Sequence, residues 1–423
     1  MNKMQVCKRF ITSSKLLFPL KMWLFSRIVI AISMLIIAPL LPAPPEGIIP
    51  NFSWDVFHGW DSIWYERIAN SGYEYINDGK YHTVAFFPLY PLIIKVFMAL
   101  GLPFIIAGTL VNNLAFLGAI LFLYIWMEEK LGLKTARWII VFLVWFPLSV
   151  YGSVIYAEGL YLLLTSATLR AFEQNQYWWV ALWGSLATAT RPTGIALIPA
   201  FLIVAWREKR KVTSYIASLA AGSGVFFYSI YCYIHFQDAL AFVRVQKAWQ
   251  PVEDFYGQGW LKMLMQVAIG TRNWKYGAVV DFWHPLLFVF ICASSCLVWR
   301  FREKLGAANT VYIFGALGFI LWLLAGNPLI NTIIIFGGAY LLWRFRSQLG
   351  VVLFVYGFCS LGLIFSTGRP ESAERYAYGI VSVAIAFGIL LSRYPRWGYI
   401  SSAFFGLLLA LYAMRFAQNV WVA

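Results

Sequence analysis

The segment "YWWVALWGSLATATRPTGIALIPAFLIVAW", residues 177–206, decides how the chain crosses a membrane. It is long enough for one transmembrane helix. However, Pro192 restricts the backbone of the residue before it and Gly194 relaxes the chain, so a break at "RPTG" is physically reasonable. A single span would also place the next basic loop, "REKRK", opposite the other basic loops. We therefore expect two short helices, 178–190 and 193–206, that hold Arg191 at or just below the membrane surface.

The rest of the chain is as apolar as this segment. Hydrophobic residues make up 61% of the 423 positions, charged residues 12%, and the mean hydropathy is +0.70. Recurrent apolar windows exclude an ordinary soluble protein and predict an all-α polytopic membrane fold with about 11–13 transmembrane helices. The predicted spans are 18–41, 103–127, 137–152, 156–172, 178–190, 193–206, 212–234, 284–300, 309–325, 328–343, 350–366, 374–392 and 397–415. They form a single integral membrane domain covering residues 1–423.

The net charge of +15 is divided among short basic clusters between the apolar runs, as the positive-inside rule requires, and does not indicate a nucleic-acid partner. We expect a cytoplasmic N-terminus and an uncleaved first transmembrane helix, because the first apolar stretch is too long for a signal peptide. This topology puts two long loops, 43–102 and 235–283, on the outer face. Their prolines and tryptophans are typical of helices that lie at the membrane interface.

The first outer loop is rich in acids: five of the 18 carboxylates lie between Asp55 and Asp78. From Asp61 we expect a helix to Asn70, with Gly72 as its C-terminal cap. Asp61 is then either the N-cap of that helix or a free carboxylate that acts as a general base. Further candidates for substrate contact in this loop are Asp55, Trp60, Trp64, Tyr65 and His82.

Three other places carry charges on the expected outer face. Glu158, in "IYAEGLYLLL", begins a helix, where it either favours the helix dipole or binds a substrate. Arg191 has no acid in its own hairpin, so its partner is either a substrate phosphate or the lipid headgroups. In "STGRPESAERYAYG", Arg375 either pairs with Glu371 on the surface or points inward.

The sequence contains no glycine-rich phosphate loop, no dinucleotide fingerprint and no metal motif such as H-E-x-x-H. A cytosolic nucleotide donor is therefore not indicated. Acids and arginines on the outer face instead favour a lipid-linked phosphate donor used at that surface. The predicted reaction needs no cofactor, although the loop that contains Asp55, Asp61 and Glu66 could hold a divalent metal.

Several of these segments resemble the GPI mannosyltransferase II (phosphatidylinositol-glycan class V) family of GT-C glycosyltransferases. The similarity covers "WDSIWYERIANSGYEY" and "VAFFPLYPLI" in the first loop, "IYAEGLYLLL", "ATRPTGIAL" and "AERYAYGIVSVAI". The resemblance implies a GT-C fold and a polyprenyl- or dolichyl-phosphate sugar donor used on the lumenal or periplasmic side. It also implies that Asp61 is the general base and that Arg191, Arg369 and Arg375 face the donor phosphate.

The sequence therefore predicts an inverting glycosyltransferase, a mannosyltransferase by resemblance, in a bacterial inner membrane or the endoplasmic reticulum. Its acceptor would be a hydroxyl of a glycolipid, a glycan or a protein, and its other partners would be membrane lipids. The alternative is a non-catalytic carrier or flippase of a lipid-linked sugar. A lipid-modifying acyltransferase or scaffold is more distant, because no His-based catalytic motif is present.

Overall fold

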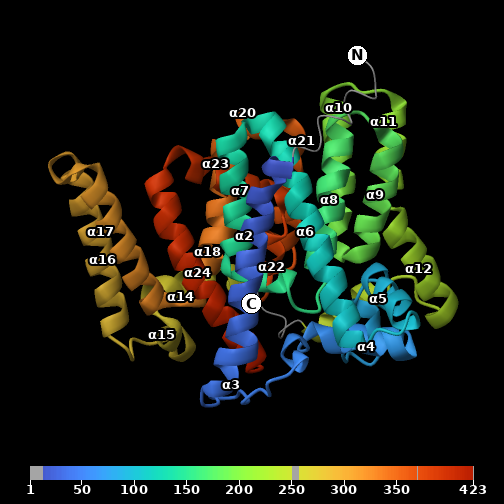
Figure 1. Cartoon of the computed structure of the whole chain (residues 1–423), viewed down its shortest axis with the longest axis horizontal. Coiled ribbons are helices and arrows are strands. Elements are labelled where there is room, and N and C mark those ends of the chain that lie inside the picture. The colour runs from blue at the N-terminus through green and yellow to red at the C-terminus, as the bar shows by residue number, and fades with distance from the viewer. Residues whose placement is uncertain (1–12, 250–256, 369, 423) are drawn as a thin grey trace.

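The computed structural model describes residues 13–249, 257–368 and 370–422, and within these ranges the chain forms helices and no strand. The helices stand side by side in one bundle (Figure 1). In lipid every backbone N–H and C=O must find a partner within the protein, and a helix provides these partners within one segment. The prediction of an all-α polytopic fold is confirmed.

The N-terminal part supplies the first candidate span and the first long loop. Helix α2 continues through a π-helical turn into α3, so that Leu16–Leu40 forms a 25-residue apolar segment long enough to cross a membrane. The loop then contains two short helices, as expected. The elements are α2 (Ser13–Ile32), η1 (Ser33–Ile37), α3 (Ala38–Leu40), η2 (Trp54–Phe57), α4 (Asp61–Ser71), η3 (Thr83–Ala85) and α5 (Leu89–Ala99).

The middle of the chain folds into antiparallel helices that pack on one another. Helix α8 packs against both α6 and α9, and α12 packs against α9. The elements are α6 (Phe104–Leu131), α7 (Leu133–Trp145), η4 (Pro147–Gly152), α8 (Glu158–Glu173), α9 (Tyr177–Thr190), η5 (Pro192–Ala196), α10 (Leu197–Arg207), α11 (Val212–Ala220) and α12 (Ser223–Phe236).

The predicted hinge at "RPTG" is confirmed. Helix α9 ends at Thr190, and Arg191 is extended, with φ −151° and ψ 146°, because the Pro192 ring disfavours helical geometry in the preceding residue. A 3₁₀ turn, η5, then leads into α10. The segment is therefore two short helices, and Arg191 lies at the break between them.

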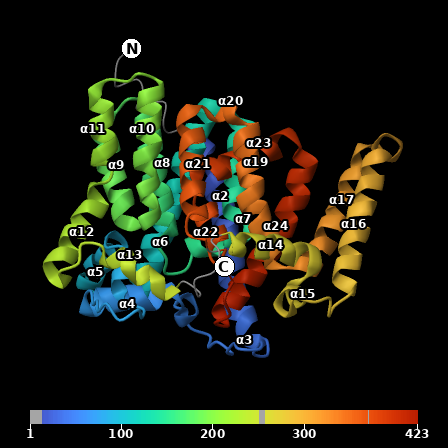
Figure 2. The same ribbon diagram turned by 180° about the vertical axis from the view of Figure 1, so that it is seen from behind.

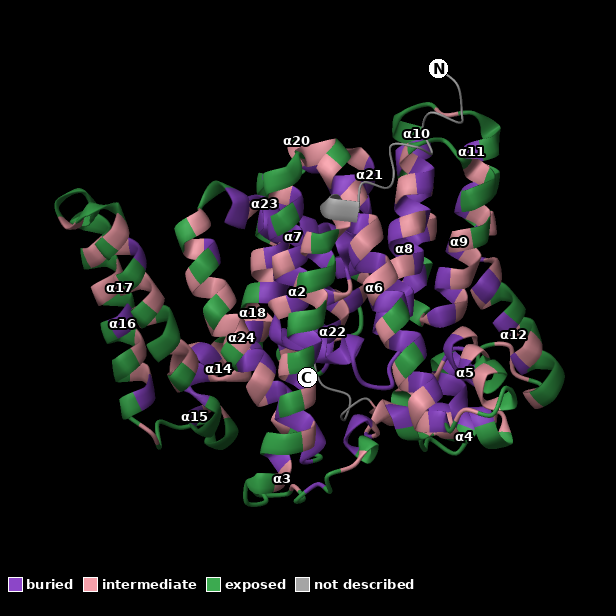
Figure 3. Ribbon diagram, viewed as in Figure 1, coloured by how far each residue is buried: buried purple, intermediate pink, exposed green. Residues whose placement is uncertain are grey.

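The C-terminal part contains the most exposed helices. The hairpin α16–α17 stands at one edge of the bundle (Figures 1 and 2), and its most apolar windows are only 11% and 6% buried, so these faces are left for lipid (Figure 3). The elements are α13 (Ala241–Arg244), η6 (Val245–Trp249), α14 (Gln258–Ile269), α15 (Thr271–Tyr276), α16 (Trp283–Arg300), α17 (Arg302–Ala325), α18 (Asn327–Thr332), η7 (Ile333–Gly337), α19 (Gly338–Arg344), α20 (Arg346–Leu349), α21 (Val351–Phe365), α22 (Ala373–Tyr378), α23 (Val381–Arg393) and α24 (Pro395–Ala417).

Three predicted spans are broken. The segment 212–234 bends by 43° between α11 and α12, 374–392 divides into α22 and α23, and 137–152 changes from α-helix to a 3₁₀ turn at Pro147. Among the described residues, five helices are long and apolar enough to cross a membrane, or six if the bent pair counts as one span. The predicted 11–13 helices included these shorter and broken segments, which hydropathy alone does not distinguish from straight spans.

The two ends of the bundle differ in charge. The turns between α10 and α11 and between α16 and α17, together with α20, lie at one end, and all three carry basic clusters (Figure 1). Helices α3, α4 and α15 lie at the opposite end. This arrangement agrees with the predicted segregation of charge, whereas the side of the membrane that each end faces stays a prediction.

The side chain of Asn112 on α6 forms hydrogen bonds that hold the irregular segment between η4 and α8 in place. Its amide nitrogen donates to the carbonyl oxygens of Tyr151 and Val154, both at 2.7 Å, and its Oδ1 accepts from the N–H of Gly159 at 2.8 Å. The side chain is fully buried. A Cβ on Gly159 would lie 2.5 Å from the Asn112 carbonyl oxygen, so α6 and α8 approach closely only because this residue is glycine.

We predict that Asn112→Ala lowers the free energy of unfolding by about 3 kcal/mol, because three buried backbone groups lose their partner. The measurement is the melting temperature of the purified protein in detergent. Asn70→Ala, at an exposed position of α4, is the control and should change stability by less than about 0.5 kcal/mol. Equal melting temperatures for the two variants would contradict the role given to Asn112.

Candidate functional site

The site begins with a tight turn at the start of α4. The Ser62 hydroxyl accepts from the N–H of Gly59 at 2.6 Å and donates to the carbonyl oxygen of the same residue at 2.8 Å. Within this turn Trp60 has φ +57° and ψ −115°, a backbone conformation that is strained for any residue other than glycine. Strain of this kind costs about 1–3 kcal/mol and persists only where the surroundings impose it. Here it allows the helix to begin at Asp61.

Asp61 forms an ion pair with Arg375 of α22. The Nη1 atom of Arg375 donates to Oδ2 of Asp61 at 2.8 Å, and no other described residue donates to the carboxylate. The two side chains differ in exposure: 22% for Asp61 and 4% for Arg375. Asp61 is therefore the accessible member of the pair, with Oδ1 free.

Two further charged residues, Glu158 and Arg191, follow Arg375 in a chain of ion pairs. Glu158, the first residue of α8, places Oε1 3.6 Å from Nε of Arg375 and 2.5 Å from Nη1 of Arg191. We call Asp61, Arg375, Glu158 and Arg191 the charge cluster. Negative and positive groups alternate along it, so its net charge is zero, and each buried charge has an oppositely charged neighbour.

Tyrosine rings surround the two arginines. The guanidinium carbon of Arg375 lies 5.2 Å from the ring centres of both Tyr151 and Tyr156 and 5.3 Å from that of Tyr376. The Tyr376 ring also lies 5.0 Å from the guanidinium of Arg191. Such rings stabilise a cation without neutralising it. The arginines are thus held in place by groups that leave their positive charge intact.

Tyr65, one turn after Asp61, is buried against the rings of Phe86 and Tyr90. Burial raises the pKa of its hydroxyl far above the ordinary value, and the negative charges of Glu158 and Asp61 add to the rise. Tyr65 therefore remains protonated beside the charge cluster.

The structure brings some of the predicted site residues together and leaves others apart. Asp61, Glu158, Arg191 and Arg375 converge. Asp55 is exposed and bonded to Ser53 at 2.9 Å. His82 bonds Asp78 at 2.7 Å, which lowers the pKa of that carboxyl.

The two predicted tryptophans pack on neighbouring rings. Trp60 packs edge-on against Trp421, and Trp64 stacks on Phe86. Arg369 lies outside the described residues.

Several open alternatives are now decided. Asp61 is not the N-cap of α4, because Trp60 occupies that position and Asp61 turns its carboxylate to Arg375. Arg375 points inward and does not pair with Glu371, which among the described residues pairs with Lys262 at 4.0 Å. Arg191 pairs with Glu158 of α8, an acid outside its own hairpin and a partner that neither predicted alternative included.

Sequence reasoning missed Tyr151, Tyr156 and Tyr376. Each lies close in sequence to a member of the charge cluster: the first two precede Glu158 in "YGSVIYAE", and Tyr376 follows Arg375. Aromatic residues beside charged residues within apolar sequence are the pattern from which these tyrosines could have been predicted. In the part of the chain that the structure describes, no three His, Cys, Asp or Glu side chains converge as metal ligands, Asp55, Asp61 and Glu66 included.

Comparison with solved structures finds remote similarity. The chain is similar to the oligosaccharyltransferase of Archaeoglobus fulgidus in its apo form, with a TM-score of 0.48 and 10% identity over 95% of this chain and 56% of that one. The structure of the same protein with Zn and sulfate gives a TM-score of 0.45 and 11% identity, over 95% and 53%. This chain thus spans about half the length of those chains. No curated protein matches the sequence.

Comparison with protein families gives a direct assignment. The family described as "Mannosyltransferase (PIG-V)" matches residues 3–216, just over half of the 423 residues. The matched range contains Asp61, Glu158 and Arg191, whereas Arg375 follows it. The resemblance noted in the sequence is therefore confirmed, and the chain belongs to the mannosyltransferase (PIG-V) family.

Proposed function

We propose that the protein is an integral membrane glycosyltransferase that moves a sugar, mannose by its family, from a polyprenyl- or dolichyl-phosphate donor to an acceptor hydroxyl. Family membership supports the class of reaction. The observation that carries the residue roles is the Asp61–Arg375 contact, which joins an accessible carboxylate to a buried cation. Acid–base chemistry needs the first group, and a phosphate donor needs the second.

Asp61 is the proposed general base. Before the donor binds, its Oδ2 is held by Arg375. Its Oδ1 is free to accept a proton from an acceptor hydroxyl that approaches from the exposed side. The strained turn at Trp60 supports this role, because backbone strain concentrates where a side chain must be aimed.

Arg375 and Arg191 are the proposed ligands of the donor phosphate. A phosphate oxygen that bonds Arg375 competes with Asp61 for the same guanidinium. Loss of that contact would leave the Asp61 carboxylate free to turn toward the acceptor hydroxyl. Binding of the donor would thereby prepare the base. Glu158 stays between the two arginines and keeps them in position.

The reaction is a single displacement. The acceptor oxygen forms a bond to the anomeric carbon while the bond from that carbon to the phosphate oxygen breaks, and its electron pair stays on the phosphate. The hydroxyl proton passes to Asp61, and the anomeric configuration inverts. Negative charge grows on the leaving phosphate, where the fixed arginines stabilise the transition state.

The acceptor would enter from the end of the bundle that carries α4, which we place in the periplasm or the lumen of the endoplasmic reticulum. Aromatic rings of the first and second loops, exposed at Tyr81 and half-buried at Trp64 and Trp249, lie together there: Tyr81 and Trp249 pack edge-on at 4.6 Å, and Trp249 also contacts Trp64. The apolar faces of sugars stack on such rings, so a glycolipid or glycan acceptor fits this surface.

Asp61→Asn should reduce transfer of labelled mannose from polyprenyl-phosphate mannose by at least about 100-fold, because the amide cannot take the proton. The assay uses purified protein, a panel of glycolipid, glycan and peptide acceptors, and a melting curve to confirm folding. Asp55→Asn, six residues earlier in the exposed loop, should retain wild-type transfer.

Undiminished transfer by folded Asp61→Asn protein would remove Asp61 from the mechanism. Absence of transfer by the wild type with every acceptor, together with movement of the intact donor across a vesicle bilayer, would instead identify a carrier.

Arg191→Lys should raise the KM for the donor or lower kcat, with a loss in kcat/KM of about 100-fold, because an ammonium group cannot form the paired bonds of a guanidinium. The charge beside Glu158 is retained, which limits the effect on folding. Arg244→Lys is the matched control: this side chain is 55% exposed and pairs with Asp238 at 3.3 Å, outside the charge cluster. Equal kinetic constants for the two variants would contradict phosphate binding by Arg191.

A further inference from the structure

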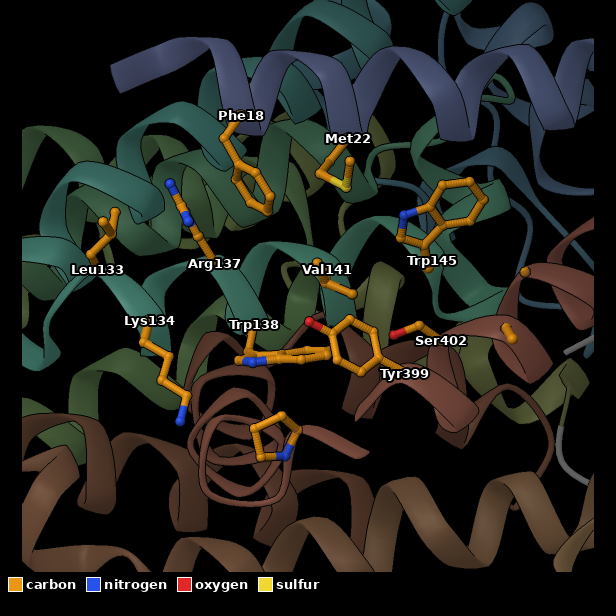
Figure 4. Close-up of a pocket in the computed structure, with 13 residues that line it drawn as sticks. Phe18, Met22, Leu133, Lys134, Arg137, Trp138, Val141, Trp145, Tyr399 and Ser402 are labelled. Carbon is orange, nitrogen blue, oxygen red and sulfur yellow. The ribbon is translucent and has the colours of Figure 1, made fainter. Parts of the chain in front are cut away.

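A cavity of about 1010 Å³ lies between α2, α7 and α24, away from the charge cluster (Figure 4). Phe18 and Met22 of α2 border one side, Trp145 of α7 lies near Met22, and Trp138 of α7 packs edge-on against Tyr399 of α24, with 5.2 Å between the ring centres. Tyr399 is 70% exposed, so the cavity reaches the surface of the bundle. Its volume is at the upper end of the range of about 300–1,000 Å³ found for small-molecule sites.

The cavity has one charged end and one apolar end. Lys134 and Arg137 lie at the start of α7, in the basic cluster "EEKLGLKTAR", whereas Trp145 and Gly406 line the far end. Both cations are exposed, and among the described residues neither has a carboxylate within ion-pair distance. Nearby acids are engaged elsewhere: Glu129 pairs with Arg170, and Glu173 pairs with Lys130. Two positive charges at the rim thus remain for an external anion.

The length of the cavity matches one leaflet of a bilayer. The lining residues of α7 run from Leu133 to Trp145, and those of α24 run from Pro395 to Gly406. Eleven to twelve residues of helix rise about 17–18 Å, and half of a hydrocarbon core is about 15 Å. Both helices start at the basic end of the bundle, so the cations would lie at headgroup depth and the tryptophans beside acyl chains.

We propose that this cavity binds an anionic glycerophospholipid of the leaflet at the basic end. Its phosphate would pair with Lys134 and Arg137, and an acyl chain would lie along Trp138, Val141 and Trp145. The proposal does not depend on the proposed catalytic activity, because the charge cluster lies at the other end of the helices.

The test measures retention of dioleoylphosphatidylglycerol and dioleoylphosphatidylcholine by the delipidated full-length protein, using native mass spectrometry over a range of lipid concentrations. The wild type should bind the anionic lipid more tightly. Lys134→Gln/Arg137→Gln should weaken that binding about thirtyfold and leave the zwitterionic lipid unaffected. Gly406→Leu should weaken the binding of both lipids. A Cβ at this position meets Trp145 at an ordinary 3.5 Å, so the larger side chain fills the cavity without a backbone clash.

Arg344→Gln/Arg346→Gln is the matched control, since it removes two exposed charges at the same end of the molecule and should leave binding unchanged. Equal affinity of the wild type for the two lipids would overturn the proposal, as would an equal loss in the control. Displacement of the anionic lipid by a much lower concentration of polyprenyl phosphate would also overturn it, and would assign the cavity to the lipid of the donor.

Discussion

The charge cluster of Asp61, Arg375, Glu158 and Arg191 constrains the rest of the structure. A charge inside an apolar bundle is costly unless an opposite charge lies beside it, and removing one partner leaves the other uncompensated. The four residues come from α4, α22, α8 and the break after α9. The first long loop, the hinge at "RPTG" and helix α22 must therefore meet at one place. The Asn112 hydrogen bond to Gly159 fixes the backbone next to Glu158, and the tight turn at Trp60 fixes the backbone next to Asp61. Both contacts therefore help to bring the charge cluster together.

The two carboxylates of the charge cluster occupy different surroundings. Glu158 is 5% exposed and lies between two arginines, a position suited to holding those cations. Asp61 is 22% exposed, and among the described residues Arg375 is its one ionic partner. The proposed base must release its partner and accept a proton, which needs the second environment. The roles that we propose for the two carboxylates thus follow from their different positions in the charge cluster.

Local sequence signals predicted local structure well. The helix from Asp61 and the break before Pro192 follow from turn residues and proline geometry, and both lie where expected. The pairing of Asp61 with Arg375 joins residues 314 positions apart, and no local pattern encodes it. The tyrosines around Arg375 were overlooked because aromatic residues are common throughout this chain. The breaks at Gly379 and Gly222 also escaped hydropathy, which measures how apolar a segment is and not how straight it is.

The central claim is that the donor phosphate takes the place of Asp61 on Arg375. The most direct measurement is a structure of the protein with a polyprenyl-phosphate sugar analogue that cannot transfer its sugar. We predict a phosphate oxygen within hydrogen-bond distance of Arg375, with Asp61 moved beyond its present 2.8 Å and facing the anomeric carbon. A bound analogue whose phosphate lies away from the charge cluster, with the Asp61–Arg375 pair intact, would contradict the account.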